Sequence, residues 1–155
     1  MSDCLQEELK QTKPFGSREE VVFLTIQKAA EELKAGFTEL LKTQELTMAQ
    51  YNVLRILRGA GSEGISCGEI SDRMITKDSD ITRMLDRLEA RELIRRERQT
   101  GDRRVILTFI AEKGLLVLEA LDTPVNKLHK GQLSHLSKKD LEKLGKLLNK
   151  ARNPK

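Results

Sequence analysis

The sequence predicts a mainly α-helical protein in which one short β-hairpin follows a series of helices. Apolar residues recur at spacings of three and four along several segments, the pattern of one buried helix face. Four of these segments open with Ser or Thr followed three positions later by Glu, Gln or Asp, a signal for a helix start. Aromatic residues make up only 3% of the chain. We therefore expect a core of aliphatic side chains, which favours helices.

The first predicted helix is long and runs from Ser17 to Lys42. Ser17 and Glu20 form its start signal, a capping box. Further apolar residues, such as Val21 and Phe23, widen its apolar surface, so the helix can serve both its own core and a partner. The main apolar stripe consists of Val22, Ile26, Ala29, Leu33, Phe37 and Leu40.

Three shorter helices are predicted next. The first ends at Arg58 before two glycines, the second ends near Met74, and the third carries Arg83 and Arg87. Only a few residues join the last two, which is the helix-turn-helix arrangement. Their predicted start signals are Thr47 with Gln50, Ser66 with Glu69, and Asp78 or Ser79.

Residues 93–98 and 105–110 are short runs rich in β-branched or charged side chains, separated by a turn that contains Thr-Gly-Asp. This pattern predicts a two-stranded hairpin. The second run is apolar on both faces, so we expect it to pack against the helices. The predicted fold is therefore mainly α: a winged helix-turn-helix with a two-stranded β wing and flanking helices.

The C-terminal part predicts two more helices. The first begins near Glu112, and Pro124 should kink or interrupt it. Ser137 and Asp140 start the last one, whose stripe includes Leu144. Neither adjoins the three-helix unit in sequence, and pairing with a second chain is the simplest way to bury their apolar faces. We expect one domain over 1–155, with dimerisation helices at 17–43 and 111–151 around a lobe at 47–110.

Charge is unevenly distributed although the net charge is only +4. Of the 13 arginines, 11 lie between Arg55 and Arg104, a stretch that holds a single lysine, Lys77. The planar guanidinium suits phosphates and guanine edges better than an ammonium does. We interpret the centre of the chain as a recognition surface; the alternative is that arginines merely favour helix formation there.

The helix after Asp78 presents a polar face if Ile81, Leu85 and Leu88 point to the core. A helix with arginines on such a face fits the major groove of DNA, and the alternative is a solvated face joined by ion pairs. Asp78 and Asp80 suit the helix dipole but would repel a phosphate. The candidate DNA-binding residues of this helix are Ser79, Asp80, Thr82, Arg83, Asp86 and Arg87.

The hairpin supplies a second candidate surface. Arg103 and Arg104 at its tip could enter a minor groove or cross a phosphate, and the alternative is an ordinary charged turn. We assign Arg95, Arg96 and Arg98 to phosphate contacts without base information.

Residues 80–104 resemble the recognition helix and wing of the MarR family of bacterial transcription regulators. The resemblance rests on Thr82-Arg83, the segment 85–89, Leu93-Ile94 and the segment 102–104, and the order of elements matches from about 21 to 151. It implies a homodimeric repressor on a pseudo-palindromic operator in double-stranded DNA, with Asp102 holding the wing arginines.

The resemblance also implies that a small aromatic or phenolic ligand can release the DNA, bound between the dimer helices and the DNA-binding lobe. Ala111 departs from the family pattern, which often has a capping Thr there and so a stronger start for the following helix. The operator bases, the ligand, the regulated genes and the choice between activation and repression are not predicted.

The sequence lacks the residue patterns that metal-binding proteins and enzymes require. His129 and His135 are six apart, which is not metal-ligand spacing, and no catalytic set or cofactor motif is present, so we expect no enzyme. Cys67 could sense peroxide beside a helix N-terminus, or be a small buried residue; Cys4 falls in a tail. With no signal peptide and no membrane segment, we expect a cytoplasmic protein. A protein-interaction module with the same fold is the runner-up.

Overall fold

The computed structural model describes residues 2–77, 80–99 and 104–153. The chain is mainly helical and carries a small antiparallel sheet, as predicted. The elements in order are α1 Ser2–Glu8, α2 Arg18–Lys42, α3 Met48–Ala60, the 3-10 turn η1 Gly61–Glu63, β1 Ile65–Ser66, α4 Cys67–Arg73, α5 Ile81–Ala90, β2 Ile94–Arg98, β3 Ile106–Ile110, α6 Glu112–Gln132 and α7 Lys138–Arg152.

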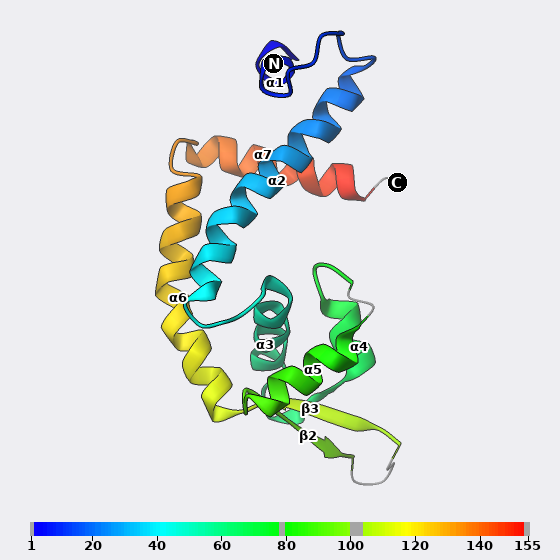
Figure 1. Cartoon of the computed structure of the whole chain (residues 1–155), viewed down its shortest axis with the longest axis vertical. Helices are drawn as coiled ribbons and strands as arrows, with labels where there is room; N and C mark the ends of the chain where they lie inside the picture. Colours follow the sequence, from blue (N-terminus) through cyan, green and yellow to red (C-terminus); the bar gives the residue numbers. More distant parts are fainter. Residues whose placement is uncertain (1, 78–79, 100–103, 154–155) are drawn as a thin grey trace.

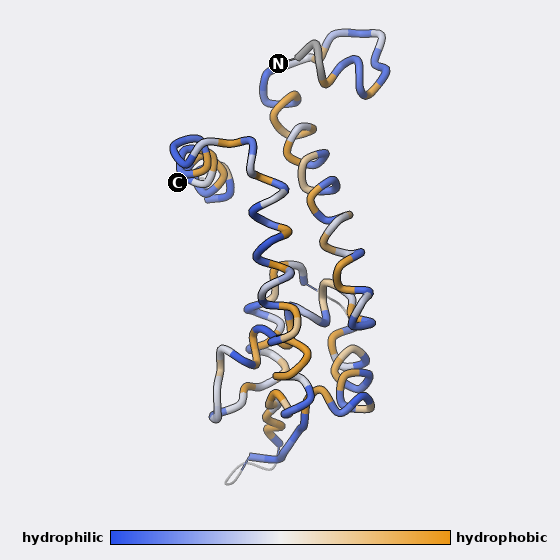
Figure 2. Tube along the Cα trace, turned by 90° about the vertical axis from the view of Figure 1, so that its left-hand side faces the viewer, coloured by the Kyte–Doolittle hydropathy of each residue, from blue (hydrophilic) through white to orange (hydrophobic). Residues whose placement is uncertain are grey.

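Two parts of the molecule are distinct in Figure 1. We call α3, α4, α5 and the sheet the lobe, and α1, α7 and the first half of α2 the arm. The second half of α2 lies beside α6 and leads from the lobe to the arm. Turned by 90°, the trace shows α7 standing apart from α2, and apolar residues continuing along α2 to its N-terminal end (Figure 2).

The core lies in the lobe and where α6 covers it. Leu54 of α3, Leu88 of α5 and Leu118 of α6 are fully buried and belong to one cluster. Fully burying one such side chain contributes about 1.5–3 kcal/mol. The arm is different, because no described residue of α7 is buried.

The wing has the predicted strands, and a third short strand joins them. The sheet order is β1-β3-β2, and β2 pairs with β3 from Ile94 opposite Ile110 to Arg98 opposite Ile106. The sequence analysis missed β1, which has two residues. It follows Gly64, whose φ of +65° favours glycine and where a Cβ would lie 2.5 Å from the Phe109 ring.

The helix starts follow the predicted signals with one variation. Both bonds of the capping box form at Thr47–Gln50 and at Ser66–Glu69. At α2, Ser17 accepts from the backbone N–H of Glu20, but the Glu20 carboxylate accepts from Gly16 rather than from Ser17. The last helix begins at Ser137, which accepts from the N–H of Asp140, as predicted.

Several boundaries differ from the prediction. The N-cap of α5 is Asp80, and the two residues expected there, Asp78 and Ser79, lie outside the described part. The helix α3 continues to Ala60, two residues past the predicted end. Pro124 does not interrupt α6, which is one helix of 21 residues. As expected, Ala111 offers α6 no side-chain cap; its N–H donates to the Leu93 carbonyl.

The N-terminal segment was expected to be a tail, but it forms α1 and packs on α2. Leu5 is buried, and Lys28 of α2 pairs with Glu8 at 3.2 Å. Within the described ranges, no helix has the length and apolar character needed to cross a membrane.

Candidate nucleic-acid interface

The helix α5 separates its apolar and polar residues onto two faces. Met84, Leu85 and Leu88 are buried in the core of the lobe. The spacing of 3.6 residues per turn then directs the residues between them outward. The exposed candidates on this face are Thr82, Arg83, Asp86 and Arg87, as predicted.

The first turn of α5 holds an arginine close to an aspartate. Arg83 Nη1 lies 3.4 Å from Asp80 Oδ2, and the Arg83 side chain is 76% exposed. An ion pair this exposed contributes at most about 1 kcal/mol to folding. Arg83 is therefore accessible, with its charge partly balanced by Asp80.

A hollow of about 170 Å³ separates this face from the start of α3. The side chains of Arg83 and Arg87 line one side, and Thr47 and Gln50 line the other. The sequence analysis identified Thr47 and Gln50 only as helix caps. Their position beside α5 depends on how α3 and α5 pack, and no local signal in the sequence carries that information.

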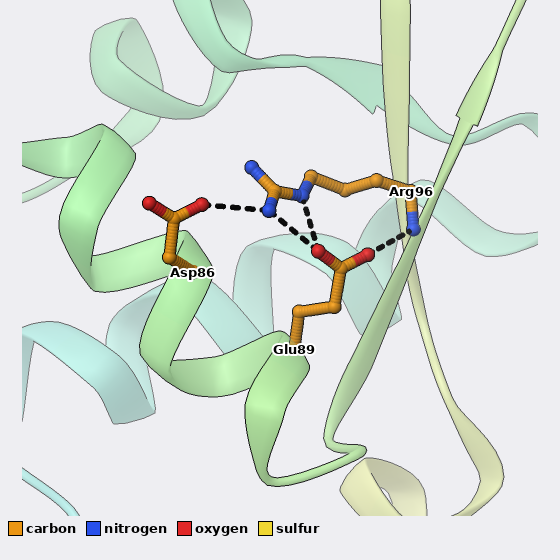
Figure 3. Close-up of polar contacts among 3 residues, drawn as sticks. All are labelled: Asp86, Glu89 and Arg96. Carbon is orange, nitrogen blue, oxygen red and sulfur yellow. Dashed lines mark hydrogen bonds and ion pairs between the residues drawn. The ribbon is translucent and has the colours of Figure 1, made fainter.

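One wing arginine binds two carboxylates of α5 (Figure 3). Arg96 donates from Nε to Glu89 Oε2 at 2.8 Å and from Nη2 to Asp86 Oδ1 at 2.6 Å, and a further Nη2 bond reaches Glu89. The backbone N–H of Arg96 donates to the other Glu89 oxygen at 3.1 Å. We call these three residues the Arg96 clamp; it joins the predicted recognition helix to the wing.

The clamp uses an open sheet edge. Because β2 is an edge strand, outward-facing N–H groups have no neighbouring strand. The Glu89 carboxylate accepts the hydrogen bond from the outward-facing backbone N–H of Arg96. Hydrogen bonding to Glu89 and then to Asp86 raises the pKa of Arg96 above its ordinary value, against the opposing effect of burial. The sequence analysis did not identify Glu89 as part of the site.

The other wing arginines are more accessible. Arg95 lies 4.2 Å from the centre of the Phe109 ring and pairs with Glu97 on its own strand. Arg98 and Arg104 are exposed near the outer end of the hairpin. Three predicted site residues, Ser79, Asp102 and Arg103, lie outside the described residues.

Two further arginines attach the lobe to the long helices. Arg91, just after α5, donates to the Glu45 carbonyl at 2.7 Å and the Gln44 carbonyl at 3.0 Å. Arg58 of α3 forms a bidentate pair with Asp122 of α6, at 2.8 and 2.9 Å. Hydrogen bonds from Arg58 lower the pKa of Asp122 below its ordinary value. These contacts tie the end of α5 to the turn after α2, and α3 to α6.

Cys67 is half-buried at the first position of α4 and packs against the core cluster. Among the described residues, no group of three or more His, Cys, Asp or Glu side chains is placed to hold a metal ion.

Comparison with known proteins identifies the family. The model of the MarR family matches residues 46–106. The HTH-type transcriptional repressor MdtR of Bacillus subtilis is 33% identical over 118 residues, which cover 76% of this chain and 75% of MdtR. The chain belongs to the MarR family. It is a transcriptional regulator with a DNA-binding fold, and not an enzyme.

Solved structures of the family have the same architecture. A MarR transcription factor from Planctomyces limnophilus is 36% identical, with a TM-score of 0.68 over 87% of this chain and 98% of that one. A mutant of MarR from E. coli, complexed with operator DNA, is 25% identical, with a TM-score of 0.76 over 84% and 92% of the two chains. The predicted winged helix-turn-helix fold is thereby confirmed.

Proposed function

We propose that this MarR-family protein is a homodimeric repressor that reads a pseudo-palindromic site in double-stranded DNA. The observation that carries the proposal is the two-faced α5, with an exposed surface of polar residues directly over a fully buried apolar one. In support, MdtR is named as a repressor, and the E. coli MarR mutant is a complex with operator DNA.

The base contacts of this proposal come from α5. Arg83 and Arg87 extend from its exposed face, where guanidinium groups can donate two bonds to a guanine edge in the major groove. Thr82 can contact a thymine methyl or a polar edge. Asp80, at the N-cap, either accepts from a cytosine amino group or positions Arg83. Ser79 stays a prediction from the sequence.

The wing supplies DNA contacts that do not depend on the base sequence. Arg95, Arg98 and Arg104 are exposed and can reach phosphates or the adjacent minor groove. The family resemblance implies that Asp102 holds the wing arginines and that either Arg103 or Arg104 enters the groove, and both roles stay predictions.

The dimer is inferred from apolar residues that this chain leaves exposed. Helix α7 has leucines exposed by 38% to 56%, and the first half of α2 exposes Phe23 by 60%. A second copy related by a two-fold axis would cover both helices, consistent with dimerisation segments at 17–43 and 111–151. The exposed apolar residues of the two helices are Val22, Phe23, Ile26, Leu33, Leu141, Leu144, Leu147 and Leu148.

Two-fold symmetry in the protein calls for an inverted repeat in the DNA. A small aromatic or phenolic ligand between the lobes and the dimer helices would change the spacing of the two α5 helices and so release the DNA. This ligand is a proposal from the family resemblance.

The first experiment is selection of duplexes from a random pool at near-physiological salt. We expect an inverted repeat with half-sites about one helical turn apart. On the selected site Arg83→Ala should lose about 1–3 kcal/mol of binding free energy, and much less on random duplex. Arg152→Ala, at the end of α7, is the control for loss of one exposed arginine.

Other outcomes favour other functions. Equal losses for Arg83→Ala on both DNAs would make Arg83 a phosphate contact. Binding without enrichment, lost steeply as salt rises, would contradict a sequence reader and favour an interaction module. DNA release by peroxide that Cys67→Ser abolishes would favour a redox sensor.

A further inference from the structure

We propose that Arg96 is a positioning residue for DNA recognition: through Glu89 and Asp86 it sets the wing relative to α5, instead of contacting a phosphate itself. The inference rests on the proposed DNA-binding function and concerns how that surface is assembled. It changes the role that the sequence suggested for Arg96.

The geometry of the clamp favours a positioning role for Arg96. Glu89 accepts from both the guanidinium and the backbone N–H of Arg96, so a single carboxylate fixes both the strand and its side chain (Figure 3). Asp86, one turn earlier on α5, adds a contact from the exposed face. Moving the wing against α5 would break all of these bonds together.

The net charge of the clamp also favours a positioning role for Arg96. The clamp contains one guanidinium and two carboxylates, so its formal charge is +1 − 2 = −1. Its guanidinium is already paired and its side chain is only 24% exposed. A phosphate approaching the clamp would meet net negative charge. Arg96 can therefore favour DNA binding by orientation, and hardly by direct attraction.

Arg98, on the same strand, differs from Arg96 in its exposure. Residues two apart on a strand share a face, so Arg96 and Arg98 lie on the same face of β2. Arg98 is exposed where Arg96 is half-buried. Arg98 is thus a matched control, on the same strand and face, with the character expected of a phosphate contact.

The decisive test replaces Glu89, because the two roles predict opposite signs. If only charge matters, removing a carboxylate from a DNA-binding surface should strengthen binding. The gain should be larger if the removal frees an arginine to contact a phosphate. If the clamp positions the wing, Glu89→Met should weaken binding to the selected operator by about tenfold, because the wing loses its attachment to α5. The control is Glu97→Met, an exposed wing carboxylate outside the clamp, which should not weaken binding.

The second test replaces the arginine. Lysine keeps the charge for a phosphate but cannot bridge two carboxylates in a fork. We expect Arg96→Lys to lose nearly as much operator affinity as Arg96→Met, and the double variant Glu89→Met, Arg96→Met to lose no more than either single one. Arg98→Met should instead reduce the dependence of log K on log salt by about one ion, on operator and random duplex alike.

The thermal unfolding midpoint of each variant is measured as well, to show that the variant still folds. Asp86→Asn, which weakens one contact at the exposed rim, is the mild variant and should show a smaller loss in the same direction. Stronger operator binding by Glu89→Met, or near-normal binding by Arg96→Lys, would overturn the clamp. If the wild-type protein selects no sequence at all, the proposed function fails; if it does and only these variants disagree, the clamp alone fails.

Discussion

The lobe and the arm use similar amounts of leucine in different ways. In the lobe, residues of the same chain cover Leu54, Leu57 and Leu88, which are at most 1% exposed. In the arm, Leu144 and Leu148 of α7 remain 42% exposed although they are spaced as one helix stripe. The same periodicity therefore marks a finished core in one region and an uncovered surface in the other.

The difference indicates that the lobe and the arm have separate functions. A lobe with its own core can hold α5 and the wing in fixed geometry, as reading DNA requires. An arm with exposed leucines gains stability only from a further surface, which in our proposal is the second copy. Four measurements test this contrast, in order of decreasing expected effect.

The largest effect is expected from Leu144→Gln combined with Leu148→Gln. Two-fold symmetry removes four leucines from the interface of each dimer. Each is 42% exposed in the single chain, so covering the exposed part contributes about 1 kcal/mol per leucine, and the dimer dissociation constant should rise about 1,000-fold. Analytical ultracentrifugation measures this. Lys139→Gln with Lys146→Gln, at exposed positions about half a turn around α7 from the two leucines, is the control. A wild-type monomer, or a variant that still dimerises, would contradict the assignment of the arm.

Truncation in the lobe should reduce the stability of the fold itself. Leu54→Ala leaves a cavity in a fully buried site, and we expect the free energy of unfolding to fall by about 2–5 kcal/mol. Urea denaturation followed by circular dichroism gives this value. Ile75→Ala, at a lobe position that is 89% exposed, should change it by less than about 0.5 kcal/mol. Similar losses in both variants would mean that the lobe has no distinct core.

The same substitution at two helical glycines should have opposite signs. A Cβ on Gly114 would collide with the Leu93 carbonyl oxygen, so Gly114→Ala should destabilise the fold by about 1–3 kcal/mol. A Cβ on Gly145 of α7 meets no atom within 4 Å, and Gly145→Ala should stabilise it by about 0.5–1 kcal/mol. Thermal unfolding compares the two. A stabilising Gly114→Ala would show that α6 is not seated on the hairpin.

The smallest effect concerns the pair that joins the lobe to α6. Because Arg58 lowers the pKa of Asp122 in the folded state, the pair stabilises the protein above the unfolded-state value of about 3.9. This stabilisation is lost as the pH falls through the lower folded-state pKa. Asp122→Asn should therefore cost less than about 1 kcal/mol at pH 7 and nothing in acid below that pKa.

Urea denaturation at several pH values tests this, with Glu119→Gln as a control on the same helix. Glu119 is exposed and acts on Arg58 through its charge alone, so its removal should have less effect. A difference between wild type and Asp122→Asn that persists unchanged in acid would mean that the pair does not depend on the Asp122 charge.

Local sequence patterns predict the helices α2 to α7, the hairpin and the exposed side of α5, but not α1. Thr47 and Ser66 start helices through bonds to residues three positions later, and Leu85 and Leu88 set the buried side by helical spacing. These features depend on neighbours within one or two turns, so short-range patterns predict them.

The contacts between those elements follow from packing and not from local patterns. Arg96 and Arg98 lie two residues apart on one strand face, and nothing local separates a clamp from an exposed cation. The difference comes from Glu89, seven residues before Arg96 on a packed helix. The same holds for β1, whose pairing with β3 spans some forty residues, from Ile65 to Thr108. Contacts between elements depend on packing across the whole lobe, which no local pattern encodes.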